Sequence, residues 1–196
     1  MKKIGLTGGI GSGKTTVAKI FEILHVPIYN SDNRAKALMD ENAELIDSIQ
    51  RLFGTDIYQN GKLDRFKLGE LVFKNAALLN QLNAIVHPAV GKDFNSWCAA
   101  QNTKYIIKEA AIIFETGIEK SLDGVIVVTA PEALRIERVM QRSNTTEALV
   151  KERMKNQFPS EVIENRANWI IKNDESELVI QQVLKIHSEI LMLSNT

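Results

Sequence analysis

The sequence is poor in several features that mark whole classes of protein. Only one cysteine, Cys98, occurs in 196 residues, which excludes a disulfide within the chain and with it the small disulfide-rich secreted scaffolds. No uncharged apolar run approaches the roughly 20 residues of a membrane-spanning helix. The 24 Lys and Arg residues are balanced by 24 Asp and Glu, whereas a dedicated nucleic-acid-binding domain is usually strongly basic. We therefore expect a soluble, cytoplasmic protein with no nucleic-acid or membrane partner.

What remains is the composition of an ordinary globular protein. Hydrophobic residues make up 44% of the chain and charged residues 24%, both within the usual range. A chain of this length fits one domain with room for a sizeable insertion, and its folding can bury roughly 70% of the surface of the unfolded chain. We expect a monomer or a small homo-oligomer.

The first 32 residues predict a strand, a glycine-rich turn, a helix and a second strand. Residues 3–7 are short and apolar, and a cluster of glycines follows at 8–13. Apolar residues then recur at the spacing of one face of an amphipathic helix, at Val17, Ile20, Phe21 and Leu24. Residues 26–29 have the pattern of a short strand, so this segment is predicted to form one βαβ unit.

Between residues 32 and 103 the strand signals vanish and helical patterns replace them. Apolar residues recur every three or four positions in the stretches 45–52, 68–72 and 78–86. Gly54 and the pair Asn60-Gly61 mark turns between these stretches. This is too much helix for a single crossover, so we predict a helical insertion between the second and third strands.

Strand signals return after this insertion. An apolar run at residues 105–107 continues into 110–114 and predicts the third strand, and further runs at 124–129 and 169–171 predict the fourth and fifth. Nearly continuous apolar runs are typical of strands buried on both faces of a parallel sheet. A polar helical stretch spans about 132–165, and the last helix carries apolar residues spaced for packing against the sheet, at Val179, Val183, Ile186, Ile190 and Leu193. The pattern predicts the α/β class, with a five-stranded parallel sheet flanked by helices.

The glycine cluster indicates a phosphate-binding loop. Four residues separate Gly8 from Gly13-Lys14-Thr15, the spacing of a P-loop, whose backbone N–H groups and following helix N-terminus face phosphate oxygens. In such a loop the lysine reaches the β- and γ-phosphates, and the threonine hydroxyl ligates Mg²⁺. A flexible glycine-rich turn is the alternative, but this cluster lies between a strand and an amphipathic helix, as the motif requires. The sequence therefore predicts a nucleoside triphosphate, bound with Mg²⁺.

Elimination narrows the class of P-loop protein to a small-molecule kinase. The Asp-x-x-Gly and Asn-Lys-x-Asp strings of GTPases do not occur, and the chain is short for a motor or transporter ATPase. Asp32 follows the second predicted strand, at the carboxyl edge where α/β sheets bind ligands. A carboxylate there can accept a proton from an acceptor hydroxyl, although an Asp at this position equally suits a helix cap.

Further charged residues fit the same chemistry. A stripe of arginines follows on the helix predicted after residue 131, at Arg135, Arg138 and Arg142. On a mobile segment they would close over the transferring phosphate; the alternative is a solvated face paired with Glu132 and Glu137. Glu109 and Glu115 flank the end of the third strand, where many P-loop enzymes keep an acid near Mg²⁺.

Together these segments resemble the dephospho-coenzyme A kinase family. The likeness runs from Gly5 to near the C-terminus, through the motifs at 5–17, 63–73, 82–88, 112–117, 138–142, 153–157 and 166–173. The resemblance implies that ATP phosphorylates the ribose 3′-hydroxyl of dephospho-coenzyme A, in the last step of coenzyme A biosynthesis. It also implies the P-loop NTPase fold, with a nucleotide-binding core (1–31, 104–137 and 167–196), a helical acceptor-binding insertion (32–103) and a lid (138–166).

The resemblance implies roles for particular residues. Lys14 and Arg142 would neutralise charge during the transfer, and Asp32 would act on the acceptor hydroxyl. Arg65 and His87 would contact the acceptor, although a lone histidine before proline is otherwise typical of a turn or a core.

The ligands of ATP and Mg²⁺ follow from the same resemblance. ATP would be held by Gly9, Gly11, Ser12, Gly13, Lys14, Thr15, Thr16, Arg138 and Asn173. Mg²⁺ would be bound by Thr15, with Glu109 or Glu115 acting through water. One departure concerns this region, because the usual Asp-x-Asp after the second strand is Asn30-Ser31-Asp32 here. The base role therefore falls on Asp32 alone.

Two other classes stay open at this point. One is a P-loop kinase for another small acceptor, such as a nucleotide or shikimate. The other is a nucleotide-dependent switch protein with no acceptor, against which the missing GTPase motifs count.

The role of Asp32 can be tested by substitution. If its carboxylate is the base, Asp32→Asn lowers kcat by roughly 10²-fold or more, because the amide cannot accept the proton, and ATP binding is retained. Steady-state kinetics and nucleotide titration measure the two effects. A variant with near-wild-type kcat would return Asp32 to a helix-capping role.

Overall fold

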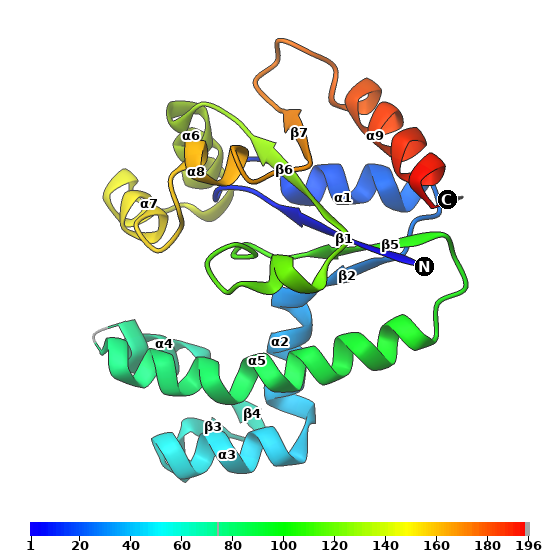
Figure 1. The fold of residues 1–196 in the computed structure, drawn as a ribbon. Helices are drawn as coiled ribbons and strands as arrows, with labels where there is room; N and C mark the ends of the chain where they lie inside the picture. Colours follow the sequence, from blue (N-terminus) through cyan, green and yellow to red (C-terminus); the bar gives the residue numbers. More distant parts are fainter. Residues whose placement is uncertain (74, 195–196) are drawn as a thin grey trace. The chain divides into compact units, whose positions relative to one another are not determined.

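The computed structural model describes residues 1–73 and 75–194 and has an α/β fold (Figure 1). The chain divides into two compact units, one formed by residues 1–30 and 102 onward, the other by residues 31–101. Among the described helices, none combines the length and apolar character that crossing a bilayer requires.

The first unit is built on a parallel sheet. In the described residues this sheet has five strands in the order β2-β5-β1-β6-β7, and each neighbouring pair is parallel. The strands are β1 (Lys2–Thr7), β2 (Ile28–Asn30), β5 (Tyr105–Glu109), β6 (Gly124–Thr129) and β7 (Trp169–Lys172). The predicted five-stranded parallel sheet is confirmed. Because β1 is central, the loop that follows it lies at the middle of the sheet's carboxyl edge.

Helices cover both faces of this sheet. Their bounds are α1 (Lys14–Ile23), α6 (Glu132–Ser143), α7 (Glu147–Met154), α8 (Ser160–Glu164) and α9 (Val179–Leu193), with a 3₁₀ turn at η2 (Ile118–Ser121). On β6, Ile126 and Val128 pack into a buried cluster with residues of α1 and α9. The alternate residues Val125 and Val127 pack with Ile163 of α8. Successive side chains of a strand point to opposite faces, so one apolar run supplies both cores.

One part of the strand prediction was wrong. The apolar run at residues 110–114 is not a strand, because β5 ends at Glu109. Ala110 N still donates to Leu6 O at 3.1 Å. Beyond it the chain turns, and the Thr116 hydroxyl donates to the Ile112 and Ile113 carbonyls within this turn. These residues are apolar because they turn beneath the sheet, where Ile113 is fully buried.

The second unit is mainly helical, as predicted. Its elements are α2 (Ser31–Glu41), α3 (Ala43–Phe53), η1 (Thr55–Ile57), β3 (Tyr58–Gln59), β4 (Lys62–Leu63), α4 (Arg65–Phe73) and α5 (Ala76–Ala99). The expectation that strands are absent here was wrong, since β3 and β4 form an antiparallel hairpin. Its two turn residues, Asn60 and Gly61, have φ of 52° and 76°. Asn-Gly favours this hairpin turn because both residues tolerate positive φ.

Burial on β6 and exposure on β7 allow a matched stability test. Ile126 is fully buried, whereas Ile170 on the adjacent strand is 41% exposed. We expect Ile126→Ala to lower the free energy of unfolding by about 2–5 kcal/mol, because it leaves a cavity in the core. Ile170→Ala should cost about 1 kcal/mol or less. Urea denaturation of both variants measures the difference; equal losses would contradict the described core.

Candidate nucleotide-binding site

The loop between β1 and α1 has a backbone path that requires glycine. Gly11 and Gly13 have φ of 81° and 96°, a region that side-chain-bearing residues rarely adopt. Space is also lacking: a Cβ atom on Gly11 would lie 2.3 Å from the Arg135 carbonyl oxygen, and one on Gly13 would lie 2.2 Å from Asn173 Nδ2. The loop is therefore clasped by α6 and by the segment after β7.

Hydrogen bonds fix the shape of this loop. Ser12 N donates to Gly9 O at 3.1 Å, and Lys14 Nζ donates to Gly8 O at 2.7 Å. The Ile10 amide donates to Gln157 Oε1 at 2.8 Å. The amides of Ile10 and Ser12 are thus engaged within the protein, while α1 begins at Lys14 and directs its N-terminus at the loop.

Gln157 is a structural residue of the site that sequence reasoning did not single out. Its Oε1 accepts from Ile10, and its Nε2 donates to Ala111 O at 3.0 Å. The only sequence signal was its place in the motif that resembles the lid. Gln157 ties the segment after α7 both to the P-loop and to the turn after β5.

The structure brings together the residues expected near Mg²⁺. The Thr15 hydroxyl donates to Glu109 Oε1 at 3.3 Å, and Asn30 Nδ2 donates to Glu109 Oε2 at 2.7 Å. Glu109 is only 6% exposed. Glu115 is engaged elsewhere, since it accepts a hydrogen bond from Phe158 N at 2.8 Å. Of the two acids, it is Glu109 that the structure places beside Thr15.

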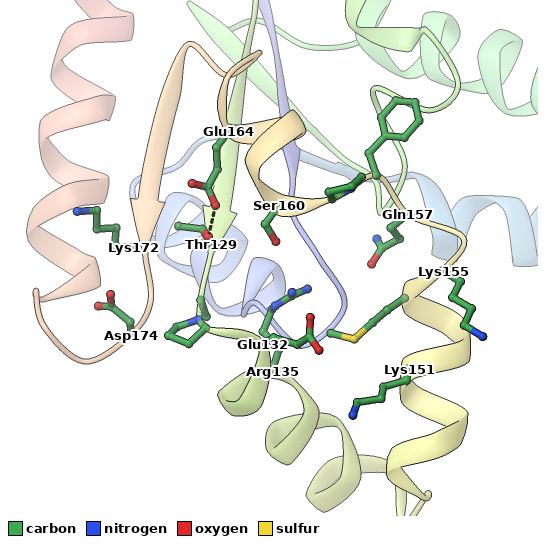
Figure 2. A pocket seen from close by; sticks show the side chains of 15 residues that line it. Thr129, Glu132, Arg135, Lys151, Lys155, Gln157, Ser160, Glu164, Lys172 and Asp174 are labelled. Carbon is green, nitrogen blue, oxygen red and sulfur yellow. Dashed lines mark hydrogen bonds between the residues drawn. The ribbon is translucent and has the colours of Figure 1, made fainter.

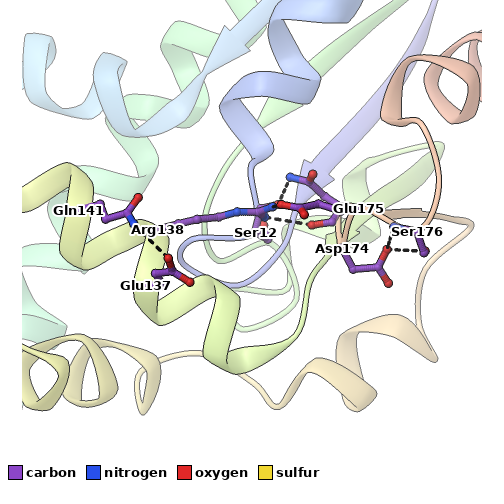
Figure 3. A network of polar contacts seen from close by, with 8 residues as sticks. Ser12, Glu137, Arg138, Gln141, Asp174, Glu175 and Ser176 are labelled. Atoms are coloured by element: carbon purple, nitrogen blue, oxygen red, sulfur yellow. Dashed lines mark hydrogen bonds and ion pairs between the residues drawn. The ribbon is translucent and has the colours of Figure 1, made fainter.

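Arg138 and Asn173 also meet at the P-loop, and Figure 3 shows Arg138 and Ser12 in this network of polar contacts. Arg138 Nη1 donates to Asn173 O at 3.0 Å, and Asn173 Nδ2 donates to Ser12 O at 2.8 Å. Arg138 also lies 4.0 Å from Glu175 as an ion pair. Three residues expected to hold ATP are therefore linked in one network.

The predicted arginine stripe does not act as one surface. Arg135 is buried, Arg138 bonds Asn173, and Arg142 is exposed in the last turn of α6. Within the described residues, the Arg142 side chain has no hydrogen bond or ion pair. The alternative expectation was that all three arginines lie on a solvated face of the helix. Of the three, only Arg142 does so, because Arg135 and Arg138 lie on the side of α6 that faces the P-loop.

Arg135 lines a cavity of about 970 Å³ beside the loop (Figure 2). Its guanidinium approaches Gly9 so closely that a Cβ there would lie 2.0 Å from Nη1, and Nε is buried with no hydrogen-bond partner among the described residues. Burial lowers the pKa of Arg135, while the charges of Glu132 and Glu164 act to raise it. The hydroxyl of Thr129 donates to Glu164 Oε1 at 2.6 Å on another wall. Sequence spacing gave no sign of this cavity.

The second unit holds the residues expected to meet the acceptor. Arg65 Nη2 donates to Asp40 Oδ2 at 2.6 Å and to Lys36 O at 2.9 Å. Desolvation acts to raise the pKa of Asp40, but hydrogen bonds from Arg65 and from the Leu63 amide hold that pKa below its usual value. Arg65 is half-exposed in this arrangement, with its charge already paired to one carboxylate.

Asp32 and His87 are both exposed on helices of this unit. Asp32 is the second residue of α2, so its carboxylate also lies where it favours the helix N-terminus. His87 lies within α5, immediately before Pro88. The turn or core position expected as the alternative for His87 was wrong, because this proline is accommodated inside a helix.

These features define a P-loop nucleotide-binding protein: a central parallel strand, a glycine loop, and a helix that opens with Lys14 and Thr15. Comparison with known proteins identifies the family. The family model described as dephospho-CoA kinase matches residues 2–178. The chain belongs to the dephospho-CoA kinase family.

Relatives and solved structures agree with this assignment. The chain is 38% identical to a dephospho-CoA kinase of Porphyromonas gingivalis, over 95% of this chain and 93% of that protein. It is 36% identical to one of Chlorobaculum tepidum, over 96% and 94%. The crystal structure of TT1252 from Thermus thermophilus has a TM-score of 0.87 at 34% identity, covering 97% of both chains. The dephospho-CoA kinase from Campylobacter jejuni has a TM-score of 0.70 at 29% identity, covering 96% of both.

A more distant neighbour bears on the shikimate alternative. Shikimate kinase from Acinetobacter baumannii aligns with a TM-score of 0.52 at 18% identity, covering all of this chain and 95% of that one. This likeness shows a shared fold alone.

The close packing around Gly11 makes a prediction about nucleotide affinity. Gly11→Ala should weaken ATP binding by at least about 10-fold, because the new Cβ strains the backbone and meets Arg135 O. Gly91→Ala is the matched control, since nothing lies within 4 Å of a Cβ there and alanine suits a helix. Fluorescence titration with a labelled ATP analogue measures both. Wild-type affinity in the Gly11 variant would contradict the described loop.

Proposed function

We propose that this chain transfers the γ-phosphoryl group of ATP to the ribose 3′-hydroxyl of dephospho-CoA, giving CoA and ADP in the last step of CoA biosynthesis. The observation that carries the proposal is a fully formed P-loop in a chain that matches the dephospho-CoA kinase family over residues 2–178. The reaction forms one O–P bond at the acceptor and breaks the bond between the γ-phosphorus and the bridging oxygen of ATP.

The P-loop unit would hold ATP. Backbone amides of the loop from Gly9 to Thr15 would face the phosphates, except those of Ile10 and Ser12, which donate within the protein. The network of Ser12, Arg138 and Asn173 supports the loop from the side. Lys14 would neutralise the charge that develops on the transferring group. Arg142, exposed at the end of α6, would add its guanidinium from the lid.

Oxygen ligands fit the chemistry of Mg²⁺, which prefers carboxylates, hydroxyls and substrate phosphates. Thr15 and Glu109 provide a hydroxyl and a carboxylate within 3.3 Å of each other, so we assign the supporting acid to Glu109 and not to Glu115. When bound, Mg²⁺ would neutralise charge on the phosphate oxygens.

The helical unit of residues 31–101 would bind the acceptor. Asp32 would accept the proton of the 3′-hydroxyl as that oxygen attacks the phosphorus. Arg65 and His87 would contact the acceptor, with Arg65 meeting its pyrophosphate. Residues 138–166 would act as a lid that excludes water and so prevents wasteful hydrolysis of ATP. We place the protein in the cytoplasm, as a monomer or a small homo-oligomer.

An acceptor panel tests this function. Release of ADP from Mg-ATP is measured with dephospho-CoA, nucleoside monophosphates, shikimate and no acceptor. We expect dephospho-CoA alone to raise the rate well above the no-acceptor rate, and Lys14→Met to abolish the increase. Lys19→Met, on the exposed side of α1, is the control. Turnover with dephospho-CoA no faster than without acceptor would overturn the proposal, and turnover with another acceptor would redirect it.

A further inference from the structure

Asn30 ends strand β2, and its side chain has a specific partner on the neighbouring strand β5. Strands β2 and β5 run parallel, and their register sets Asn30 directly beside Glu109. Both residues end their strands, so their side chains lie at the carboxyl edge of the sheet. The Asn30 amide and the Glu109 carboxylate meet there at 2.7 Å.

The chemistry of the contact fixes its direction. A carboxylate only accepts hydrogen bonds, so the group that faces Glu109 must be the amide nitrogen of Asn30 and not its oxygen. This bond holds Oε2, and the other oxygen, Oε1, is left facing the Thr15 hydroxyl at 3.3 Å. The Glu109 carboxylate thus accepts one hydrogen bond from Asn30 on β2 and one from Thr15, the residue expected to ligate Mg²⁺.

Burial makes this donor necessary. Glu109 is 6% exposed, and a buried charge is costly unless hydrogen bonds replace the water that it loses. Among the described side chains, Thr15 and Asn30 donate hydrogen bonds to its two carboxylate oxygens. Asn30 supplies a donor without adding a second negative charge opposite Glu109, where like charges on adjacent strands repel.

We propose that Asn30 is a positioning residue, whose amide holds the Glu109 carboxylate in the orientation that supports Mg²⁺ at Thr15. This role rests on the proposed function, because it takes the nucleotide to be bound with Mg²⁺. Asn30 itself does not touch the metal. Its effect passes through Glu109, so it disappears when Glu109 loses its charge.

A double-mutant cycle tests this dependence. Four proteins are titrated with a fluorescent, non-hydrolysable ATP analogue: the unchanged chain, Asn30→Leu, Glu109→Gln and the double variant. Each titration is repeated over a series of free Mg²⁺ concentrations, with EDTA giving the metal-free value. We expect Asn30→Leu to raise the half-saturating Mg²⁺ concentration roughly 10-fold, the usual size for loss of a group that orients a metal ligand. In the Glu109→Gln background the same change should cause no further shift. Affinity for the analogue in EDTA should stay near the wild-type value.

Two results would overturn the proposal: a wild-type Mg²⁺ dependence in Asn30→Leu, or an equal shift in the Glu109→Gln background. A merely structural role would lower thermal stability but would leave the Mg²⁺ shift independent of Glu109. Asn30→Ala repeats the cycle in case leucine prevents folding, and Asn102→Leu is the control, because Asn102 is exposed in the same unit.

The readout uses no acceptor, so it separates this proposal from the function. If dephospho-CoA does not raise the rate but the effect of Asn30→Leu depends on Glu109, the positioning role is supported and the proposed acceptor is wrong. If dephospho-CoA raises the rate but the two substitutions act additively, the kinase activity is supported and the role of Asn30 is wrong.

Discussion

The structure of the nucleotide site depends on one steric constraint, the absence of side chains at Gly11 and Gly13 in the loop after β1. The loop turns through positive φ at Gly11 and Gly13, and two segments from the C-terminal part of the chain fill the space that their side chains would take. Arg135 and Asn173 can approach only because that space is open. The same glycines therefore shape the phosphate-binding backbone and allow α6 and the segment after β7 to be anchored on it.

Strand order then decides which polar residues meet. With β5 between β1 and β2, the end of β5 lies next to the loop on one side and next to Asn30 on the other. Glu109 can reach Thr15 and Asn30 at the same time only in this order. Thr15, Asn30 and Glu109 are distant in the sequence, and they become neighbours because the carboxyl ends of parallel strands lie at the same edge of the sheet.

Apolar pattern and local motif predicted most of this fold, and contacts between distant segments account for what they missed. The run at residues 124–129 predicted β6 with correct bounds, because a strand buried on both faces is apolar at every position. The similar run at 110–114 was wrongly predicted to be a strand, since a buried turn is equally apolar. The Asn60-Gly61 pair predicted a turn but not the hairpin around it, because β3 and β4 have only two residues each and are too short to show an apolar pattern.

In the site, the P-loop was predictable because its chemistry is local. The contacts of Gln157 and Arg135 with the loop were not, because no spacing rule links residues so far apart.

In the part of the chain that the structure describes, buried polar atoms that lack a hydrogen-bond partner are concentrated near the P-loop, where binding and not stability explains the arrangement. Among the described residues, four buried side-chain atoms have no hydrogen-bond partner, and two of them, Ser12 Oγ and Arg135 Nε, belong to the P-loop and its closest neighbour. Each such atom costs roughly 1–3 kcal/mol relative to a satisfied one, so a loop selected only for stability would not keep them together. Glu109, equally buried, is satisfied on both oxygens. The site thus combines a fully bonded carboxylate with polar groups held against the phosphate loop, and this uneven satisfaction is expected where a fold is adapted to bind an anion.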